Sequence, residues 1–267
     1  MQFSTISGSG QRFVISQSGS GPDVVLLHGF PDTPHSYAEL ADALSASGRR
    51  VTVPWLRGYH PETIVPGRPY DPITLGRDVL ALLDTLEMPQ AVIVGHDWGA
   101  LAAYVAAALE PERVRGLVTL AIPHPSLLRR TPASLFAARH FIALKLPWAA
   151  RSASRGDFAY FDRLYSRWAP NWSGSAREES LDHVKAALGS PETLEGALDY
   201  YRALPLGPRP PQLERPAPVP GLIVGGTEDI VAAELFTATA ALLPSPSRAL
   251  IVAGAGHWPH REDPGLV

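Results

Sequence analysis

The chain has 267 residues, of which 45% are hydrophobic and 18% are charged, and its formal net charge is −3. This composition is typical of one globular domain with an insertion, and it gives no reason to expect nucleic acid as a partner. Cysteine is absent, which excludes disulfides, thiolate catalysis and cysteine-bound metals. No apolar run is long enough to span a bilayer and residues 1–10 do not resemble a secretory signal, so we expect a cytoplasmic protein without membrane contact.

Strand-like and helix-like segments alternate along the first half of the chain. The predicted strands are residues 12–19, 23–29, 49–55, 90–96 and 114–123, and the predicted helices are residues 34–47, 71–88 and 98–110. The segment 90–96 is short, apolar and β-branched, which is typical of a strand buried on both faces. Such alternation predicts a mostly parallel sheet flanked by helices.

The pattern changes near residue 124. From there to residue 212 the sequence is helical and aromatic-rich, with helices predicted at residues 133–148, 158–168, 181–189 and 193–204. A proline-rich connector follows, and then a strand at 221–226, a helix at 232–243 and a strand at 247–254. The predicted organisation is therefore an α/β core of residues 1–123 and 213–267, interrupted by a helical cap of residues 124–212.

The stretch VIVGHDWGA, residues 92–100, has the glycine spacing of a nucleophile elbow, with Asp97 where a serine usually stands. Gly95 and Gly99 allow a strained turn and close packing of the strand against the helix. Such a turn places Asp97 at the carboxyl edge of the sheet, where open α/β sheets bind ligands. The alternative interpretation is that Asp97 only caps the following helix.

Two further polar residues follow later strands. Asp229 stands in TEDIV after the strand at 221–226, and His257 stands in GAGHWPH after the last strand. Each could be an ordinary loop or cap residue, but all three groups are predicted at strand ends, which indicates a catalytic triad. Glu228 is the nearest competitor for the acid, and we prefer Asp229 because it is the last turn residue before an apolar helix.

The stretch LLHGFPD, residues 26–32, completes the predicted site. The main-chain N–H groups of Phe30 and Trp98 are expected to form an oxyanion hole. Pro31 indicates a fixed turn, for which a cis bond is one form. His28 is expected to support the loop rather than to take part in the chemistry.

Together HGFPD, VGHDWGA, TEDIV and GAGHWPH resemble the α/β-hydrolase superfamily, and specifically its epoxide hydrolase branch, over nearly the whole chain. The resemblance implies an α/β-hydrolase fold with an inserted helical cap. It implies Asp97 as nucleophile, His257 as the base that activates water, and Asp229 as the acid that orients it. We expect a small-molecule epoxide as substrate, no cofactor, no metal, and a monomer or homodimer.

The carboxylate at position 97 also has a chemical rationale. An aspartate with an ordinary pKa of about 3.9 is already ionised at neutral pH and suits displacement at a saturated carbon. The product is an ester, which water activated by His257 then hydrolyses. Attack by Asp97 on a carboxylic ester would give a strained mixed anhydride, so the substitution argues against an esterase.

In the epoxide hydrolases, the opening epoxide receives its proton from the cap, usually from two tyrosines. The motif GALDYYRAL places one at Tyr201, with Tyr200 as the fallback. The position that resembles the second holds His140, which can also donate a proton, and Tyr160 is the alternative donor. The substrate pocket is expected to be apolar and aromatic, lined by Phe30, Trp98, Tyr160 and Trp148.

Two other functions remain open at this stage. A haloalkane dehalogenase uses the same nucleophile and two donors that hold the halide, for which Trp98 and an indole from Trp148, Trp168 or Trp172 are candidates. Phe30 stands where that class often has asparagine. A ligand-binding protein of the same fold without turnover is the third alternative.

Overall fold

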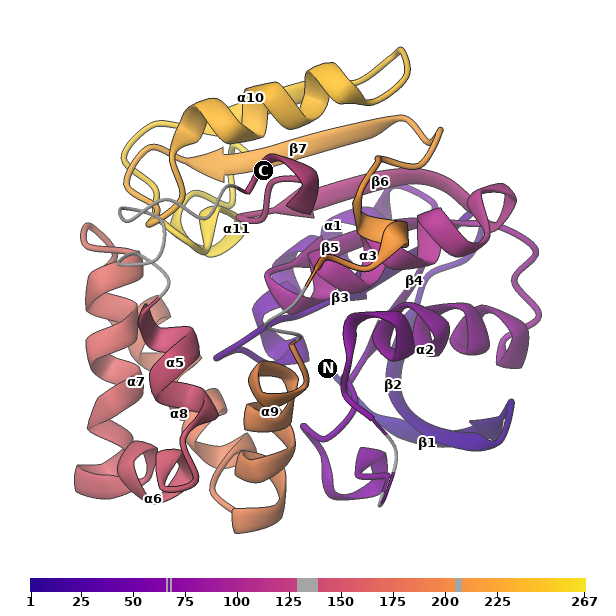
Figure 1. The fold of residues 1–267 in the computed structure, drawn as a ribbon. Helices are drawn as coiled ribbons and strands as arrows, with labels where there is room; N and C mark the ends of the chain where they lie inside the picture. The colour runs from indigo at the N-terminus through magenta and orange to yellow at the C-terminus, as the bar shows by residue number, and fades with distance from the viewer. Residues whose placement is uncertain (66, 68, 129–138, 205–207) are drawn as a thin grey trace.

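The computed structural model describes residues 1–65, 67, 69–128, 139–204 and 208–267. These residues form one eight-stranded sheet in the order β1-β2-β4-β3-β5-β6-β7-β8 (Figure 1). The strands are β1 Ser4–Gly8, β2 Gln11–Ser18, β3 Asp23–Leu27, β4 Arg50–Pro54, β5 Ala91–His96, β6 Val114–Leu120, β7 Gly221–Gly226 and β8 Arg248–Val252. The contacts β1–β2 and β2–β4 are antiparallel and all others are parallel, which confirms the predicted fold class.

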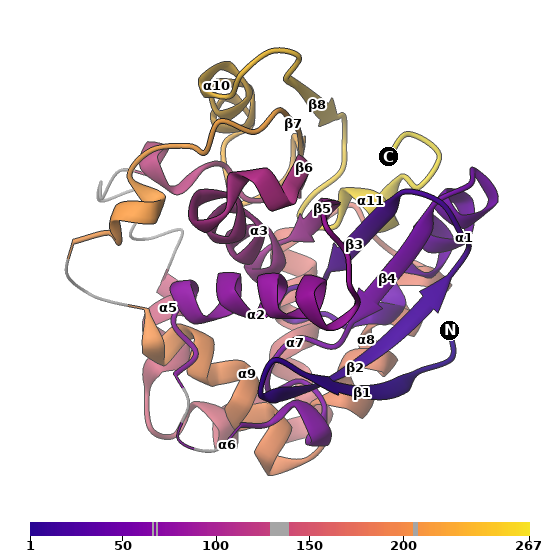
Figure 2. The ribbon, with the colours of Figure 1, turned by 90° about the vertical axis from the view of Figure 1, so that its right-hand side faces the viewer.

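Helices cover both faces of this sheet (Figure 2). One face carries α2 Pro72–Thr85, α3 Trp98–Leu109 and α10 Ala233–Leu242, and the other carries α1 Ala38–Ala46. Successive strand residues alternate between two apolar clusters, so that Ile93 packs with α2 and α3 whereas Val94 packs with α1. This double burial explains why the predicted strand at 90–96 is apolar throughout.

Within the described residues between β6 and β7, five α-helices lie together beside the core (Figure 1). They are α5 Arg139–Lys145, α6 Ala149–Ala153, α7 Arg155–Trp168, α8 Ser175–Ala187 and α9 Pro191–Ala203. The Tyr165 hydroxyl on α7 donates to the carbonyl of Pro31 at 3.0 Å, and the Tyr200 hydroxyl on α9 donates to that of Arg57 at 2.7 Å. These bonds hold the helices over the loops that follow β3 and β4. The division of the chain into a core and a separate cap of residues 124–212 stays a prediction.

Some elements differ from the prediction. The strand β1 was not expected, because STISG has no apolar alternation, and it forms by pairing with β2. The five-residue α6 was also missed, since it is too short for a periodic pattern. The predicted helix at 133–148 falls partly outside the described residues, within which α5 accounts for 139–145. In the described ranges, no helix combines the length and apolarity needed to cross a membrane.

The turn between β5 and α3 brings the strand and the helix into close contact. Asp97 adopts φ 49° and ψ −114°, which is a strained backbone for a residue with a side chain. A Cβ atom at Gly99 would collide with the carbonyl oxygen of Leu27, and one at Gly95 with that of Gly99. The strand and helix can therefore approach closely only with glycine at both positions, as expected for a nucleophile elbow.

Replacing Gly99 with alanine should lower the free energy of unfolding by about 1 to 3 kcal/mol, because backbone atoms must move to admit the methyl group. The matched control is Gly116→Ala in β6, where a Cβ atom would meet only the Pro220 carbonyl oxygen at 3.6 Å. Urea denaturation followed by circular dichroism measures both. Equal stability of the two variants would contradict this account of the turn.

Candidate active site

The carboxylate of Asp97 is held from two sides. Its Oδ1 accepts a hydrogen bond from the Phe30 N–H at 2.8 Å, and its Oδ2 lies 3.6 Å from Nε2 of His257. The side chain is 13% exposed and borders a cavity. The Phe30–Pro31 bond is cis. Phe30 thus provides a main-chain donor where the sequence predicts one, whereas the corresponding role of the Trp98 N–H remains a prediction.

His257 connects Asp97 to a second carboxylate. Its Nδ1 lies 3.2 Å from both Oδ1 and Oδ2 of Asp229, whose side chain is fully buried. Glu228, the competing acid, is exposed and accepts a hydrogen bond from Thr227. The structure therefore brings together Asp97, His257 and Asp229, which come from the ends of β5, β8 and β7.

The charges in this cluster stabilise one another. Burial alone would lower the pKa of His257, but the carboxylates of Asp229 and Asp97 outweigh it and raise that pKa to about 10. Burial would raise the pKa of Asp97, but the contact with His257 and its charge outweigh burial and lower it. The resting site therefore holds an ionised Asp97 beside a protonated His257.

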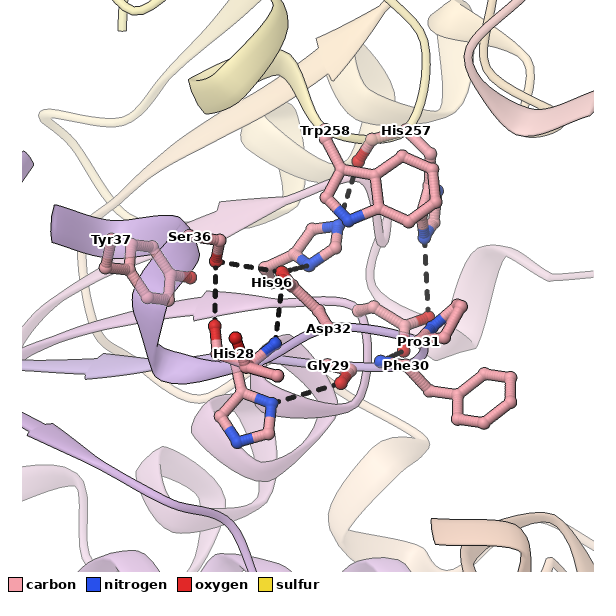
Figure 3. A network of polar contacts seen from close by, with 12 residues as sticks. His28, Gly29, Phe30, Pro31, Asp32, Ser36, Tyr37, His96, His257 and Trp258 are labelled. Atoms are coloured by element: carbon pink, nitrogen blue, oxygen red, sulfur yellow. Dashed lines mark hydrogen bonds and ion pairs between the residues drawn. The ribbon is translucent and has the colours of Figure 1, made fainter. Parts of the chain in front are cut away.

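A buried polar network supports the loop of His257 from below (Figure 3). The Nε2 of His96 donates to the His257 carbonyl at 2.8 Å, while its Nδ1 lies 3.3 Å from Oδ2 of Asp32. Asp32 also accepts hydrogen bonds from the Thr33 N–H at 2.7 Å and the Ser36 hydroxyl at 2.9 Å. Asp32 and His96 lie inside the motifs HGFPD and GHDWG, but nothing in the sequence pairs them.

His28 has the supporting role predicted for it. Its Nδ1 donates to the Gly29 carbonyl, and its Nε2 accepts from the Leu56 N–H, each at 3.1 Å. Burial lowers the pKa of His28 to about 4, so the ring is neutral at physiological pH. Its two ring nitrogens are thus used to join the loops after β3 and β4.

The two adjacent tyrosines of α9 occupy different environments. The Tyr200 hydroxyl donates to the Arg57 carbonyl. The residue named as the fallback proton donor therefore already uses its hydroxyl in a structural contact. Tyr201 is buried, with its ring 5.0 Å from that of Phe30 and 5.1 Å from that of Trp98. Burial and the nearby Asp97 charge raise the pKa of Tyr201 well above its ordinary value. Tyr201 is therefore a neutral phenol beside the nucleophile.

The remaining predicted cap residues are placed unequally. His140 is buried on α5, with its ring 6.2 Å from that of Tyr201 and 4.8 Å from that of Trp168. Tyr160 is partly buried on α7, and burial raises its pKa. Trp148 is 59% exposed, which corrects the expectation that it lines the substrate pocket. It precedes the short α6 and does not belong to the described wall of the cavity beside Asp97.

A cavity of about 210 Å³ adjoins Asp97 and Trp98. Its other described lining residues are mainly apolar: Pro72, Leu101, Ile122, Pro125, Leu128, Phe141, Leu204, Pro208, Arg209, Pro210 and Leu213. Phe30 and Tyr160, which the sequence predicted to line the pocket, are not among them. Phe30 is fully buried under Tyr201 and Phe161. The cavity is thus apolar as predicted, but the proline-rich connector contributes more of its wall than the sequence suggested.

Comparison with known proteins identifies the family of the chain. A family model described as the alpha/beta hydrolase fold matches residues 22–264, so the chain belongs to the α/β-hydrolase family. An epoxide hydrolase from Caballeronia sordidicola is 29% identical over 77% of this chain, which spans 60% of that protein's length. Epoxide hydrolase A of Mycobacterium tuberculosis is 28% identical over 98% of this chain and 93% of its own. The crystal structure of epoxide hydrolase VrEH1 from Vigna radiata shares the fold, with a TM-score of 0.81 and 24% identity over 99% and 94% of the two chains.

The Asp97→Asn substitution should lower the pKa of His257 from about 10 toward its ordinary value of 6.5, because one of the two carboxylates that raise it loses its charge. NMR titration of the imidazole measures this change. Asp42→Asn, at an exposed position on α1, is the control and should leave the pKa of His257 in place. An unchanged pKa in the Asp97 variant would show that Asp229 alone sets it.

Proposed function

We propose that this protein is an epoxide hydrolase that opens an epoxide to a vicinal diol through an ester on Asp97. The proposal is supported by its epoxide hydrolase relatives. The observation that carries it is the position of Asp97, whose Oδ1 is held by the Phe30 N–H while its Oδ2 faces His257 and the neutral phenol of Tyr201 lies close by. A carboxylate nucleophile and a proton donor are the two groups that epoxide opening requires.

In the first step, Oδ2 of Asp97 attacks one epoxide carbon. The bond between that carbon and the epoxide oxygen breaks, an ester bond to Asp97 forms, and the released alkoxide takes the phenolic proton of Tyr201. Its raised pKa keeps Tyr201 protonated until this moment. His140, buried beside Tyr201, is proposed as the second donor to the same oxygen.

In the second step, the ester itself prepares the base. Esterification removes the charge of Asp97, so one of the two groups that raise the pKa of His257 is lost. The imidazole can then release its proton to solvent, and the Tyr201 phenolate takes a proton from solvent. Neutral His257 then takes a proton from water, and the hydroxide adds to the ester carbonyl. The resulting oxyanion at Oδ1 lies against the Phe30 N–H. Collapse of this intermediate releases the diol, which takes the proton held by His257. The carboxylic acid left on Asp97 then protonates His257 and restores the resting ion pair.

One observation favours haloalkane dehalogenation as the second candidate. Within the described part of the chain, the buried indole nitrogen of Trp168 has no hydrogen-bond partner. Trp98 follows the nucleophile, and the Trp168 ring lies 4.9 Å from that of His257. Trp168 thus offers an indole N–H near His257, and the indole of Trp98, which also interacts with the Tyr201 side chain, is the second candidate donor to a halide.

Parallel assays on aryl and alkyl epoxides and on matched haloalkanes separate the two functions when diol and halide are both measured. Diol formation without halide release supports the epoxide hydrolase, and halide release alone replaces it with the dehalogenase. A protein that binds these compounds but turns over none would be a binding protein instead. Cell fractionation tests the predicted cytoplasmic location. Light scattering tests whether the protein is a monomer or a homodimer.

The His257→Gln variant should accumulate the ester, because alkylation of Asp97 needs no base whereas hydrolysis does. Intact mass spectrometry after incubation with a turned-over epoxide should show an adduct of the full epoxide mass. The double variant Asp97→Asn/His257→Gln is the control and should show none. If the single variant stays unmodified under conditions where the wild type turns over, the covalent route is wrong.

The neighbouring tyrosines allow a matched test of proton donation. Tyr201→Phe should lower kcat/KM for an alkyl epoxide by about 10²-fold or more, because the leaving alkoxide loses its acid. Tyr200→Phe removes an equal hydroxyl whose partner is the Arg57 carbonyl, and it should cost about 1 kcal/mol of stability with little loss of activity. Equal losses of activity in both variants would assign Tyr201 a packing role only.

A further inference from the structure

The cavity beside Asp97 contains one cationic side chain in its described wall. Arg209 lies in the proline-rich connector that follows α9, and it borders the cavity together with Asp97. All other described residues of the wall are uncharged, and most are aliphatic, aromatic or proline. Arg209 is partly exposed, so its charge remains in contact with water and open to an anionic ligand.

The structure provides Arg209 with no carboxylate among the described residues. Its Nη2 donates to the carbonyl of Leu128 at 3.0 Å, and Leu128 itself borders the cavity. Two other arginines of the helical region form ion pairs: Arg177 with Asp162 and Arg202 with Asp199, each at 2.8 Å. The guanidinium has five N–H donors, so the single bond to Leu128 orients the group and leaves donors for a ligand.

The positive charge also acts on the cavity wall. Burial, followed by the charge of Arg209, lowers the pKa of His124 to about 4. His124 precedes the short helix η4 Pro125–Leu127, whose Pro125 also borders the cavity. The charge of Asp97, by contrast, is balanced by His257. Within the described residues, Asp97 therefore has an oppositely charged neighbour, whereas Arg209 forms no ion pair.

We propose that Arg209 binds a carboxylate of the substrate, so that the preferred substrates are epoxides carrying a carboxylate some distance from the ring. This inference rests on the proposed epoxide hydrolase function. Arginine pairs with carboxylates through two parallel hydrogen bonds, which suits a partly buried anion site. Because the epoxide must reach Asp97 while the carboxylate pairs with Arg209, the two groups bind at different parts of the cavity, with an alkyl chain against residues such as Leu101, Phe141 and Leu213.

The test compares terminal epoxy alkanoates of increasing chain length with their methyl esters, which differ only in charge at the far end. The wild type should favour the acid over its ester by about tenfold or more in kcat/KM at the best chain length. Arg209→Gln should remove this preference by weakening the acid alone. Arg215→Gln, an exposed arginine of the same connector, is the matched control and should keep the preference.

Inhibition provides a readout that needs no epoxy acid. Simple alkanoates should inhibit hydrolysis of a neutral aryl epoxide more strongly than alkanols of equal length, and Arg209→Gln should abolish the difference. If neutral epoxides are turned over but Arg209→Gln changes acids and esters alike, the role of Arg209 is wrong while the enzyme function stands. If no epoxide gives diol, the proposed function fails instead. Calorimetric binding of alkanoates, expected to be lost in Arg209→Gln, then still decides whether Arg209 binds carboxylates.

Discussion

The contact of His257 with two carboxylates is the interaction on which the site depends. His257 and the side chain of Asp229 are buried and Asp97 is mostly buried, and a buried charge without its partner costs several kcal/mol. The three are compatible only when the ends of β5, β7 and β8 lie in register, so that Asp97 and Asp229 meet His257 from opposite sides. The parallel part of the sheet provides that register, and the strained turn at Asp97 aims its carboxylate at the imidazole.

The same charges determine the order of the two proposed chemical steps. While Asp97 is ionised, His257 is protonated and is no base; once Asp97 is esterified, the imidazole can act on water. The network of Asp32 and His96 does not touch the reacting atoms, but it holds the main chain of His257 through its carbonyl. A buried carboxylate below the site therefore contributes to the position of the base without sharing its chemistry.

The helical region adds specificity to this core through neighbouring residues with different tasks. Consecutive residues of a helix point about 100° apart, so Tyr200 and Tyr201 differ in their other contacts although both rings pack against Trp98. Tyr200 reaches back to the core and anchors α9, which leaves Tyr201 over Phe30 and Trp98. The connector after α9 then places Arg209 in the wall of the cavity, so one length of chain supplies both the proposed acid and the proposed anchor for the substrate.

The sequence by itself determined the alternation of strands and helices, the elbow at Asp97, and Asp229 and His257 as its partners, because glycine spacing and strand ends are local features. It missed β1, whose residues form a strand only when paired with β2. It placed Trp148 at the substrate, although that ring lies on the surface. The tertiary structure alone decided the pairing of Asp32 with His96, the separate tasks of Tyr200 and Tyr201, and the presence of Arg209 in the cavity. These features depend on contacts between residues far apart in the chain, and no local pattern of residue types encodes which distant groups will meet.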